Sequence, residues 1–415
     1  MSEKLRLLFF YKNIGKYALN ALAGSLQTHC PELPLHFVKT EQQLIEALSH
    51  NNESTHTLVL WTFYTSQFAA SAKSLHKIKR LSPMRAKILH LAGGVHCSAK
   101  PESVLRAGFD YVACGEGEEL IVQTARAFSQ GEFQPQIRGL CYLDSDRGFV
   151  YQGRAIVESL DDYPPVSDKY KKFGPLEITR GCVYACKFCQ TPYVNKARFR
   201  HRSVDNCVDF AKIMYAHGLR DFRFISPTSL SYGSDNYEVN ATAIDALLYG
   251  MRSQLGKDAR IFFGSFPSEV RPEHISSDIL RLLKQYVDND NLIIGAQSGS
   301  KSVLDSCGRG HDVDQVRQAT LLCLEHGFYP NVDFLFGLPG EKEWDRQLSL
   351  DFAEELSAMG AKIHLHGFMP LPGTPYADAH AVTLEKSTLD RLNHLCSSGK
   401  AYGQWKNQTT GIDRN

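Results

Sequence analysis

The chain has 415 residues, 43% of them hydrophobic and 22% charged, so it is long enough for two or three globular domains with ordinary cores. Its 46 lysines and arginines nearly balance 45 aspartates and glutamates, which argues against electrostatic attraction to nucleic acid or to a membrane surface. The apolar run near the N-terminus, LRLLFF, is too short for a signal peptide or a membrane span, so we expect a cytoplasmic protein.

Strand-like and helix-like segments alternate over the first third of the chain. Near-continuous apolar runs at 5–11 and 55–64 are typical of buried parallel strands, and amphipathic segments between them are typical of covering helices. This alternation predicts a doubly wound, Rossmann-like α/β domain over residues 1–135. A small hairpin and a linker containing a Pro-Pro pair are expected over 136–174.

A second alternation begins at residue 175. Its six strand candidates are PLEITRG, DFRFISP, ARIFFGSF, NLIIGAQSG, NVDFLFGLPG and AKIHLHGFMPLPG. Helical segments separate them, which predicts a partial (β/α)6 barrel of the TIM type over 175–395. Glycines and polar residues recur directly after these strands, where such barrels carry their active-site groups. The remaining segment, 396–415, lacks periodicity and is expected to be a tail without regular structure.

Three cysteines cluster in ITRGCVYACKFCQTPY, residues 178–193, with CxxxCxxC spacing directly after the first barrel strand. The other cysteines are isolated, and the odd total of 11 favours reduced thiols over a disulfide framework. A structural zinc site needs a fourth ligand at regular spacing, which neither Cys207 nor His201 provides. Thiolates in one compact loop suit an iron–sulfur cluster, and three of them on a four-iron cluster leave one iron open. The predicted cluster ligands are Cys182, Cys186 and Cys189.

The cysteine loop, with Phe188 before its last cysteine, resembles the signature of the radical S-adenosylmethionine (SAM) superfamily. The resemblance implies a [4Fe–4S] cluster whose open iron binds S-adenosyl-L-methionine, and reductive cleavage of SAM to methionine and a 5′-deoxyadenosyl radical. It also implies an electron donor such as flavodoxin or ferredoxin.

Later strand ends extend this resemblance. IGAQSGSKSVLDSCGRG and FLFGLPGE are similar to stretches of the multidomain radical enzymes, whereas the family's Gly-Gly-Glu is absent from SPTS at the second strand end. By this resemblance Phe188 and the backbone near Leu338 lie beside adenine, Gln297 and Ser298 contact ribose or carboxylate, and Arg309 pairs with the methionine carboxylate. The implied SAM-binding residues are Phe188, Ser226, Thr228, Ser265, Gln297, Ser298, Arg309 and Leu338.

The first domain carries LAGGVHCSAKPESVLRAGFDYVACGEGEE, which resembles the cobalamin-binding domains that precede many radical SAM barrels. Glycine suits such a site because a side chain would block the close approach of a bulky ligand. The loop YKNIGKY after the first strand lacks the histidine of the family's D-x-H-x-x-G motif, so it supplies no imidazole to cobalt. The implied cobalamin-binding residues are Thr65, Ser66, Gly93, Gly94, Gly115, Glu116 and Gly117.

His364 and His366 alternate on the strand KIHLHGF, so their side chains point to the same face. The sequence leaves open whether they bind a metal ion or are hydrogen-bonded residues near the substrate.

These resemblances predict a cobalamin-dependent radical SAM methyltransferase acting on an unactivated carbon of a small-molecule or peptide substrate. A non-methylating rearrangement remains an alternative, as does a methylthiotransferase with a second cluster on Cys30, Cys97 and Cys114. A non-enzymatic iron–sulfur sensor is a third alternative. We expect no membrane and no nucleic-acid partner, and the sequence assigns no catalytic acid or base.

Overall fold

The computed structural model describes residues 4–50, 54–82, 87–380 and 382–410. The chain divides into two compact units, Met1–Gly174 and Pro175–Asn415. Within the described ranges, every helix is too short or too polar to span a membrane.

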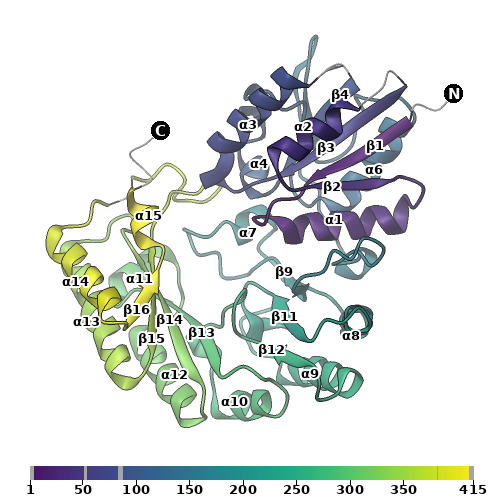
Figure 1. The fold of residues 1–415 in the computed structure, drawn as a ribbon. Coiled ribbons are helices and arrows are strands. Elements are labelled where there is room, and N and C mark those ends of the chain that lie inside the picture. Colours follow the sequence, from purple (N-terminus) through teal and green to yellow (C-terminus); the bar gives the residue numbers. More distant parts are fainter. Residues whose placement is uncertain (1–3, 51–53, 83–86, 381, 411–415) are drawn as a thin grey trace. The chain divides into compact units, whose positions relative to one another are not determined.

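A seven-stranded sheet forms the centre of the first unit, in the order β2-β1-β3-β4-β5-β6-β7 (Figure 1). The first five strands in this order are parallel, and β6 and β7 are antiparallel. An order of 2-1-3-4-5 is that of a doubly wound fold, whose ligand crevice lies at the carboxyl ends of the strands. The strands are β1 (Lys4–Phe10), β2 (Leu35–Val38), β3 (Thr55–Thr62), β4 (Ile88–Gly93), β5 (Tyr111–Ala113), β6 (Leu140–Asp144) and β7 (Gly148–Val150).

Helices cover both faces of this sheet because its central strands are apolar on both sides. Leu7 and Phe9 of β1 pack with α1 and α6, whereas Leu8 and Phe10 pack with α2 and α3. The helices are α1 (Lys16–His29), α2 (Glu41–Ser49), α3 (Phe68–Leu81), α4 (Val95–Ala99), α5 (Pro101–Arg106) and α6 (Glu118–Ser129).

The first unit extends beyond the domain boundary expected near residue 135. The hairpin β6–β7 joins the sheet through β5, with Val112 opposite Cys141. The segment after the hairpin lies against α1, where Asn20 Nδ2 donates to the carbonyl of Phe173 at 3.0 Å. Sheet pairing and helix contacts therefore make the expected hairpin and linker part of the first unit.

The second unit contains all six strands that the sequence predicts, as β8, β11, β12, β13, β14 and β15. Two parallel sheets, β12-β11-β8 and β13-β14-β15-β16, are linked by a parallel bridge between Val270 and Ile294. The strands are β8 (Leu176–Glu177), β9 (Thr179–Arg180), β10 (Arg200–His201), β11 (Asp221–Ile225), β12 (Arg260–Phe262), β13 (Asn291–Gln297), β14 (Tyr329–Phe336), β15 (Lys362–Gly367) and β16 (Ala401–Gly403).

Helices follow these strands and cover their outer side (Figure 1). For example, α12 contacts β13 and β14, α13 contacts β14 and β15, and α14 contacts β16. The helices are α7 (Thr191–Val194), α8 (Val204–Ala216), α9 (Ala241–Leu255), α10 (Ser277–Lys284), α11 (Lys301–Cys307), α12 (Val313–Glu325), α13 (Glu343–Met359), α14 (Lys386–Ser397) and α15 (Trp405–Thr410).

The C-terminal segment corrects one expectation, because the residues expected to form an irregular tail contain β16 and α15. Ala401 pairs with Ile363 of β15, and the buried Trp405 begins α15. A three-residue strand and a six-residue helix are too short to produce a periodic pattern, so tertiary pairing decides their structure.

Candidate functional site

The three clustered cysteines lie in the loop between β9 and α7. Gly181 opens this loop with φ +81°, and a Cβ on it would overlap the carbonyl oxygen of Arg198. Ala185 also adopts a left-handed conformation, with φ 49°, and its carbonyl accepts a hydrogen bond from Tyr193 Oη at 2.7 Å. Strain of this kind is held only where surrounding contacts fix the backbone, so the loop is a rigid support for its thiols.

The thiols suit a cluster better than a single ion. Among the described residues, their sulfurs do not form a group in which all lie within 4.8 Å of one another, as ligands of one metal ion do. A four-iron cluster binds each thiolate at a different iron, which requires wider spacing. Burial raises the pKa of Cys182 to about 11 and also raises that of Cys189, so nearby positive charge is needed to keep them ionised.

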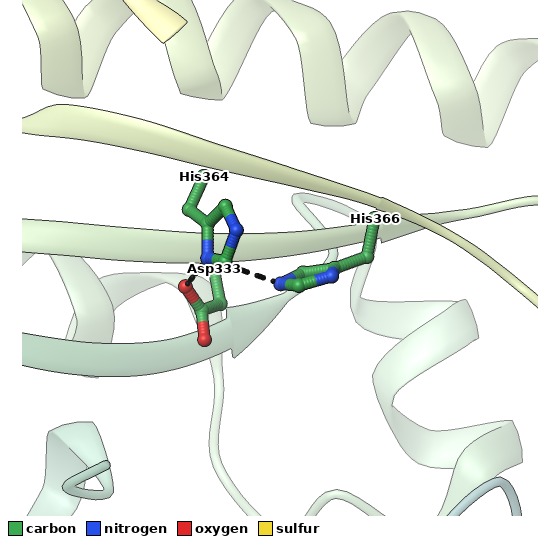
Figure 2. A group of neighbouring side chains, drawn as sticks. All are labelled: Asp333, His364 and His366. Atoms are coloured by element: carbon green, nitrogen blue, oxygen red, sulfur yellow. Dashed lines mark hydrogen bonds and ion pairs between the residues drawn. The ribbon is translucent and has the colours of Figure 1, made fainter. Parts of the chain in front are cut away.

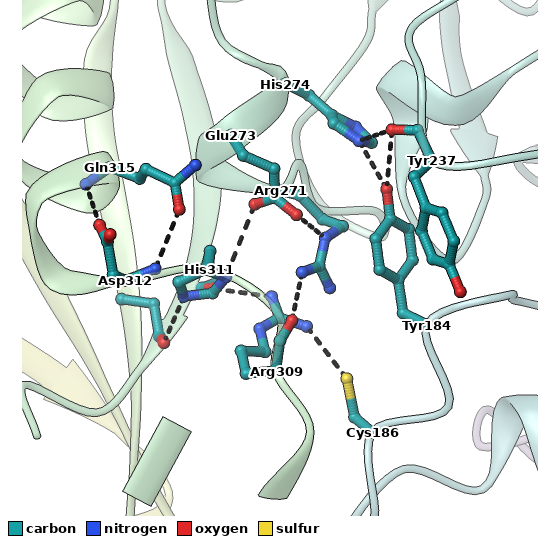
Figure 3. Close-up of polar contacts among 12 residues, drawn as sticks. Tyr184, Cys186, Tyr237, Arg271, Glu273, His274, Arg309, His311, Asp312 and Gln315 are labelled. Carbon is teal, nitrogen blue, oxygen red and sulfur yellow. Dashed lines mark hydrogen bonds and ion pairs between the residues drawn. The ribbon is translucent and has the colours of Figure 1, made fainter. Parts of the chain in front are cut away.

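Arg309 connects the cysteine loop to the end of β13 (Figure 3). Its Nη1 donates to Cys186 Sγ at 3.7 Å, and its Nη2 donates to the carbonyl of Gly295 at 2.6 Å. Glu269 Oε1 lies 3.7 Å from the same guanidinium. Arg309 Nε, by contrast, is buried without a hydrogen-bond partner within the part of the chain described here. A buried orphan donor of this kind is expected where a polar ligand belongs.

The end of β13 brings three polar side chains to one point. A Cβ on Gly295 would overlap Arg309 Nη2 and lie 3.0 Å from Gln297 Nε2 and 3.1 Å from Glu269 Oε2. A bulge between Gly295 and Gln297, where Gln297 has φ 75°, turns the strand end at this position. β-Bulges frequently re-aim side chains beside active sites. Two residues predicted to bind SAM, Gln297 and Arg309, are thus brought together beside Cys186.

Two further predicted SAM contacts, Phe188 and Leu338, share an apolar cluster with Val303 and Phe368. Leu338 is 1% exposed, and Phe188 is half-buried against this cluster. Phe188 on the cysteine loop and Leu338 after β14 thus belong to one apolar cluster, an environment that suits an adenine ring.

The four predicted hydroxyl side chains divide into two groups. Thr228 Oγ1 and Ser265 Oγ are buried and, within the described structure, lack hydrogen-bond partners. Ser226 Oγ instead donates to the carbonyl of Thr228 at 2.8 Å, and Ser298 Oγ lies 3.0 Å from Ser349 Oγ on α13. Thr228 and Ser265 therefore retain hydrogen-bonding capacity for a ligand, whereas the hydroxyls of Ser226 and Ser298 are engaged within the protein.

In the first unit, Gly93 ends β4 and Gly94 follows it, and the two glycines differ in whether protein contacts require the absence of a side chain. A Cβ on Gly94, which has φ +104°, would lie 2.9 Å from the carbonyl oxygen of Phe63. A Cβ on Gly93 would make only ordinary contacts, 3.6 Å from Ala113 Cβ and 3.8 Å from the carbonyl oxygen of Trp61. Protein contacts therefore explain Gly94 and leave Gly93 available for close approach by a ligand.

The other predicted cobalamin residues have structural contacts or lie exposed. A Cβ on Gly115 would overlap the carbonyl oxygen of Ala155, and Glu116 Oε2 accepts from the backbone N–H of Val157 at 2.8 Å. A Cβ on Gly117 would lie 2.9 Å from Leu22 Cδ2. Thr65 Oγ1 lies 3.2 Å from His96 Nδ1, and Ser66 is exposed.

A second arginine beside the cysteines was not predicted from the sequence. Arg271 lies 3.6 Å over the ring of Tyr184, pairs with Glu273 and donates to the carbonyl of Arg309 (Figure 3). His311 Nδ1 lies 3.6 Å from Glu273 Oε2. The sequence offers only an arginine between β12 and α10, which local patterns do not distinguish from a surface residue.

The two histidines of β15 meet Asp333 of β14 (Figure 2). His364 Nδ1 lies 2.9 Å from Asp333 Oδ1 and 3.1 Å from His366 Nε2. The alternation of KIHLHGF predicted the shared face of the histidines. Asp333 was missed because its contact depends on the register of two strands.

Comparison with known proteins identifies the second unit. Residues 176–353 match the model of the radical SAM superfamily. The chain is 26% identical over 330 residues to an uncharacterized methyltransferase of Pyrococcus horikoshii, covering 74% of this chain and 68% of that protein. It is 27% identical over 246 residues to a tRNA-2-methylthio-N(6)-dimethylallyladenosine synthase of Pelobacter propionicus, covering 57% of this chain and about half, 53%, of that protein.

Two solved structures share the fold of most of the chain. The radical SAM methyltransferase TsrM from Kitasatospora setae, with tryptophan and a SAM analogue bound, superposes with a TM-score of 0.70 at 18% identity, covering 90% of this chain and 75% of that one. The cobalamin-dependent radical SAM enzyme OxsB, with aqua-cobalamin bound, gives 0.67 at 16% identity, covering 99% and 57%. These likenesses confirm the predicted fold class, a Rossmann-like α/β domain followed by a partial barrel of the radical SAM type.

Proposed function

We propose that this protein, which carries a radical SAM domain over residues 176–353, is a cobalamin-dependent methyltransferase acting on an unactivated carbon. The observation that carries the proposal is the meeting of three groups in the second unit. These are the thiol loop, the orphan donor of Arg309, and the polar side chains of Gln297 and Glu269 beside Gly295. A cluster scaffold without a cofactor would have no use for such an arrangement.

The residues beside the cysteine loop fit a cluster-bound SAM. Cys182, Cys186 and Cys189 would hold a [4Fe–4S] cluster, which supplies the electron that cleaves SAM to a 5′-deoxyadenosyl radical. Arg309 offers a guanidinium to a carboxylate, while Phe188 and Leu338 offer an apolar wall to adenine.

The polar part of the same ligand has its own donors and acceptors. Thr228 and Ser265 bring unused buried hydroxyls, and Gln297 brings an amide beside Arg309. These groups would bind and orient the cofactor and exclude water, which is the protein's share of radical chemistry.

Gly93 supports a cobalamin site in the first unit, because its missing side chain serves no other described contact. The loop Tyr11–Tyr17 has no histidine, and Tyr11 Oη donates to Asn20 Oδ1 at 2.5 Å. The cobalt of a bound cobalamin would therefore receive no imidazole from this loop. The substrate would be a small molecule or a peptide, and the electron donor a flavodoxin or ferredoxin of the cytoplasm.

The first unit argues against a methylthiotransferase, the activity in the name of several relatives. Cys30 lies in the core between the sheet and α1, whereas Cys97 and Cys114 lie in the core on the opposite face. Three thiols on two sides of a sheet are unsuited to one second cluster.

SAM cleavage tests the radical half of the proposal. Protein reconstituted anaerobically with iron and sulfide should form 5′-deoxyadenosine from SAM when dithionite is added, and Cys186→Ala should not. The matched control is Cys307→Ala, which removes a buried thiol near the loop while keeping the carbonyl that accepts from Lys187 N at 2.9 Å. Equal 5′-deoxyadenosine formation by wild type and Cys186→Ala would refute the assignment.

A further inference from the structure

Asp333, His364 and His366 converge on the inner face of the sheet formed by β13 to β16 (Figure 2). Asp333 and His364 are register partners on adjacent parallel strands. Ile363 and Leu365 are fully buried, so the alternating histidines point to the other face of β15. The side chains remain partly accessible, with Asp333 13% and His364 25% exposed.

The hydrogen bonds among these three side chains cannot all be made at once, because two of them involve the same ring nitrogen of His364. His364 Nδ1 lies within hydrogen-bonding distance of both Asp333 Oδ1 and His366 Nε2. A neutral imidazole places at most one hydrogen on Nδ1. When that hydrogen is aimed at Asp333, the Nε2 lone pair of His366 faces a nitrogen that is already committed. A cation at the shared point satisfies all three atoms at once.

The spacing fits such a cation. Ligand atoms about 2.1 Å from one metal ion stand roughly 3.0 to 3.4 Å apart in octahedral or tetrahedral geometry. Of the observed separations, 3.1 Å lies within this range and 2.9 Å lies just below it, and all three ligand atoms lie within 4.8 Å of one another. We propose that Asp333, His364 and His366 bind one divalent first-row transition-metal ion, separate from the iron of the cysteine loop.

The donor set indicates the class of metal and of ligand. Two imidazoles and one carboxylate suit zinc or another first-row divalent ion, and three protein ligands leave coordination positions for water or a substrate oxygen. The ring of Tyr402 stacks on His364, with ring centroids 4.5 Å apart and an interplanar angle of 9°. This stack fixes the orientation of the imidazole, as supporting contacts around metal ligands commonly do.

The proposed site faces the barrel interior that also holds the polar cluster at the end of β13. Asp333 is the register partner of Gly295 on β13, so its side chain points to the face on which Glu269 and Arg309 meet at Gly295. A substrate bound through a carboxylate or carbonyl oxygen on the metal would thus lie in the same interior as the cofactor residues. The binding itself does not rest on the proposed methyl transfer.

Zinc binding to the full-length protein tests this proposal. The chain is first reconstituted anaerobically with iron and sulfide, so that the cysteine loop is occupied, and is then titrated with Zn²⁺ by calorimetry with elemental analysis. We expect about one zinc ion per chain beyond the cluster, with affinity reduced at least 10-fold in Asp333→Asn and His366→Ala. The matched control, His326→Ala, removes a histidine that caps the end of α12 and whose ring hydrogen-bonds to the carbonyl of Leu322, and this variant should bind zinc as wild type does.

Asp333→Asn keeps the size of the side chain, and circular dichroism together with cluster content verifies that each variant is folded. Absence of zinc beyond the cluster would overturn the proposal, as would binding that is unchanged in both folded variants. Neither result depends on cobalamin retention or SAM cleavage, so failure of this site is distinguishable from failure of the proposed function.

Discussion

If Gly93 faces a ligand, as we propose, and Gly115 serves only protein packing, alanine at the two positions should give opposite results. Gly93 ends β4 and Gly115 comes shortly after β5, and the resemblance to cobalamin domains covers both. Their surroundings differ. Gly115 has φ +104° and would place a Cβ 2.8 Å from the backbone nitrogen of Ala155, whereas the contacts expected of a Cβ on Gly93 are ordinary.

Two contributions make up the loss in free energy of unfolding that we expect for Gly115→Ala. A non-glycine residue in a left-handed conformation costs about 1–2 kcal/mol. Overpacking against the backbone of Ala155 adds about 1–3 kcal/mol. A total of about 2–5 kcal/mol lowers the melting temperature of a unit of this size by about 4–20 °C. Gly93→Ala should change stability by less than about 0.5 kcal/mol, or about 2 °C.

Cobalamin retention should follow the opposite order. A methyl group on Gly93 intrudes where a corrinoid must approach closely, and a misfit of about 1–3 kcal/mol weakens binding roughly 5- to 150-fold. Thermal unfolding of the apo protein and equilibrium titration with hydroxocobalamin measure the two effects. Wild-type cobalamin affinity in Gly93→Ala would refute the ligand-facing assignment, and a wild-type melting temperature in Gly115→Ala would refute the steric one.

Three further predictions concern the electrostatics and the cysteines. Arg271→Met removes one partner of a buried ion pair and should lower the free energy of unfolding by about 3–5 kcal/mol. Arg260→Met breaks an exposed ion pair and should lower it by less than about 1 kcal/mol. Similar losses in the two variants, measured by thermal unfolding, would contradict this reasoning. Burial raises the pKa of Glu341 from 4.5 to about 7, so the folded state binds more protons than the unfolded state between these values and its stability falls as pH rises through that window. Glu341→Gln should therefore gain stability relative to wild type between pH 5 and pH 8, and a constant difference would count against a buried neutral carboxyl. Cys114→Ala should keep the iron content of wild type after reconstitution, while a loss of iron would support a second cluster in the first unit.

Long, strongly patterned elements were predictable from the sequence. The apolar strands β1 and β3, the six barrel strands and the amphipathic helices between them follow the expected periods. The C-terminal boundary of the first unit was not predictable from the sequence. Hairpin strands and an irregular segment join this unit through long-range contacts such as that between Asn20 and Phe173. The pairing of β16 with β15 was missed for the same reason.

In the candidate site, too, features set by local sequence were predictable and features set by long-range packing were not. The spacing of the cysteines and the motif around Gln297 are local, so the sequence carries them. Arg271 and Asp333 reach their sites only through the packing of distant strands, and no local pattern marks them. The sequence also cannot distinguish Gly93 from Gly115, because the difference lies in what surrounds each Cα.

Anaerobic reconstitution with iron, sulfide and hydroxocobalamin, followed by desalting, optical spectra and elemental analysis, tests the central claim most directly. The account predicts about four irons and about one corrinoid retained per chain. A cluster spectrum with no retained corrinoid would contradict the cobalamin-dependent assignment.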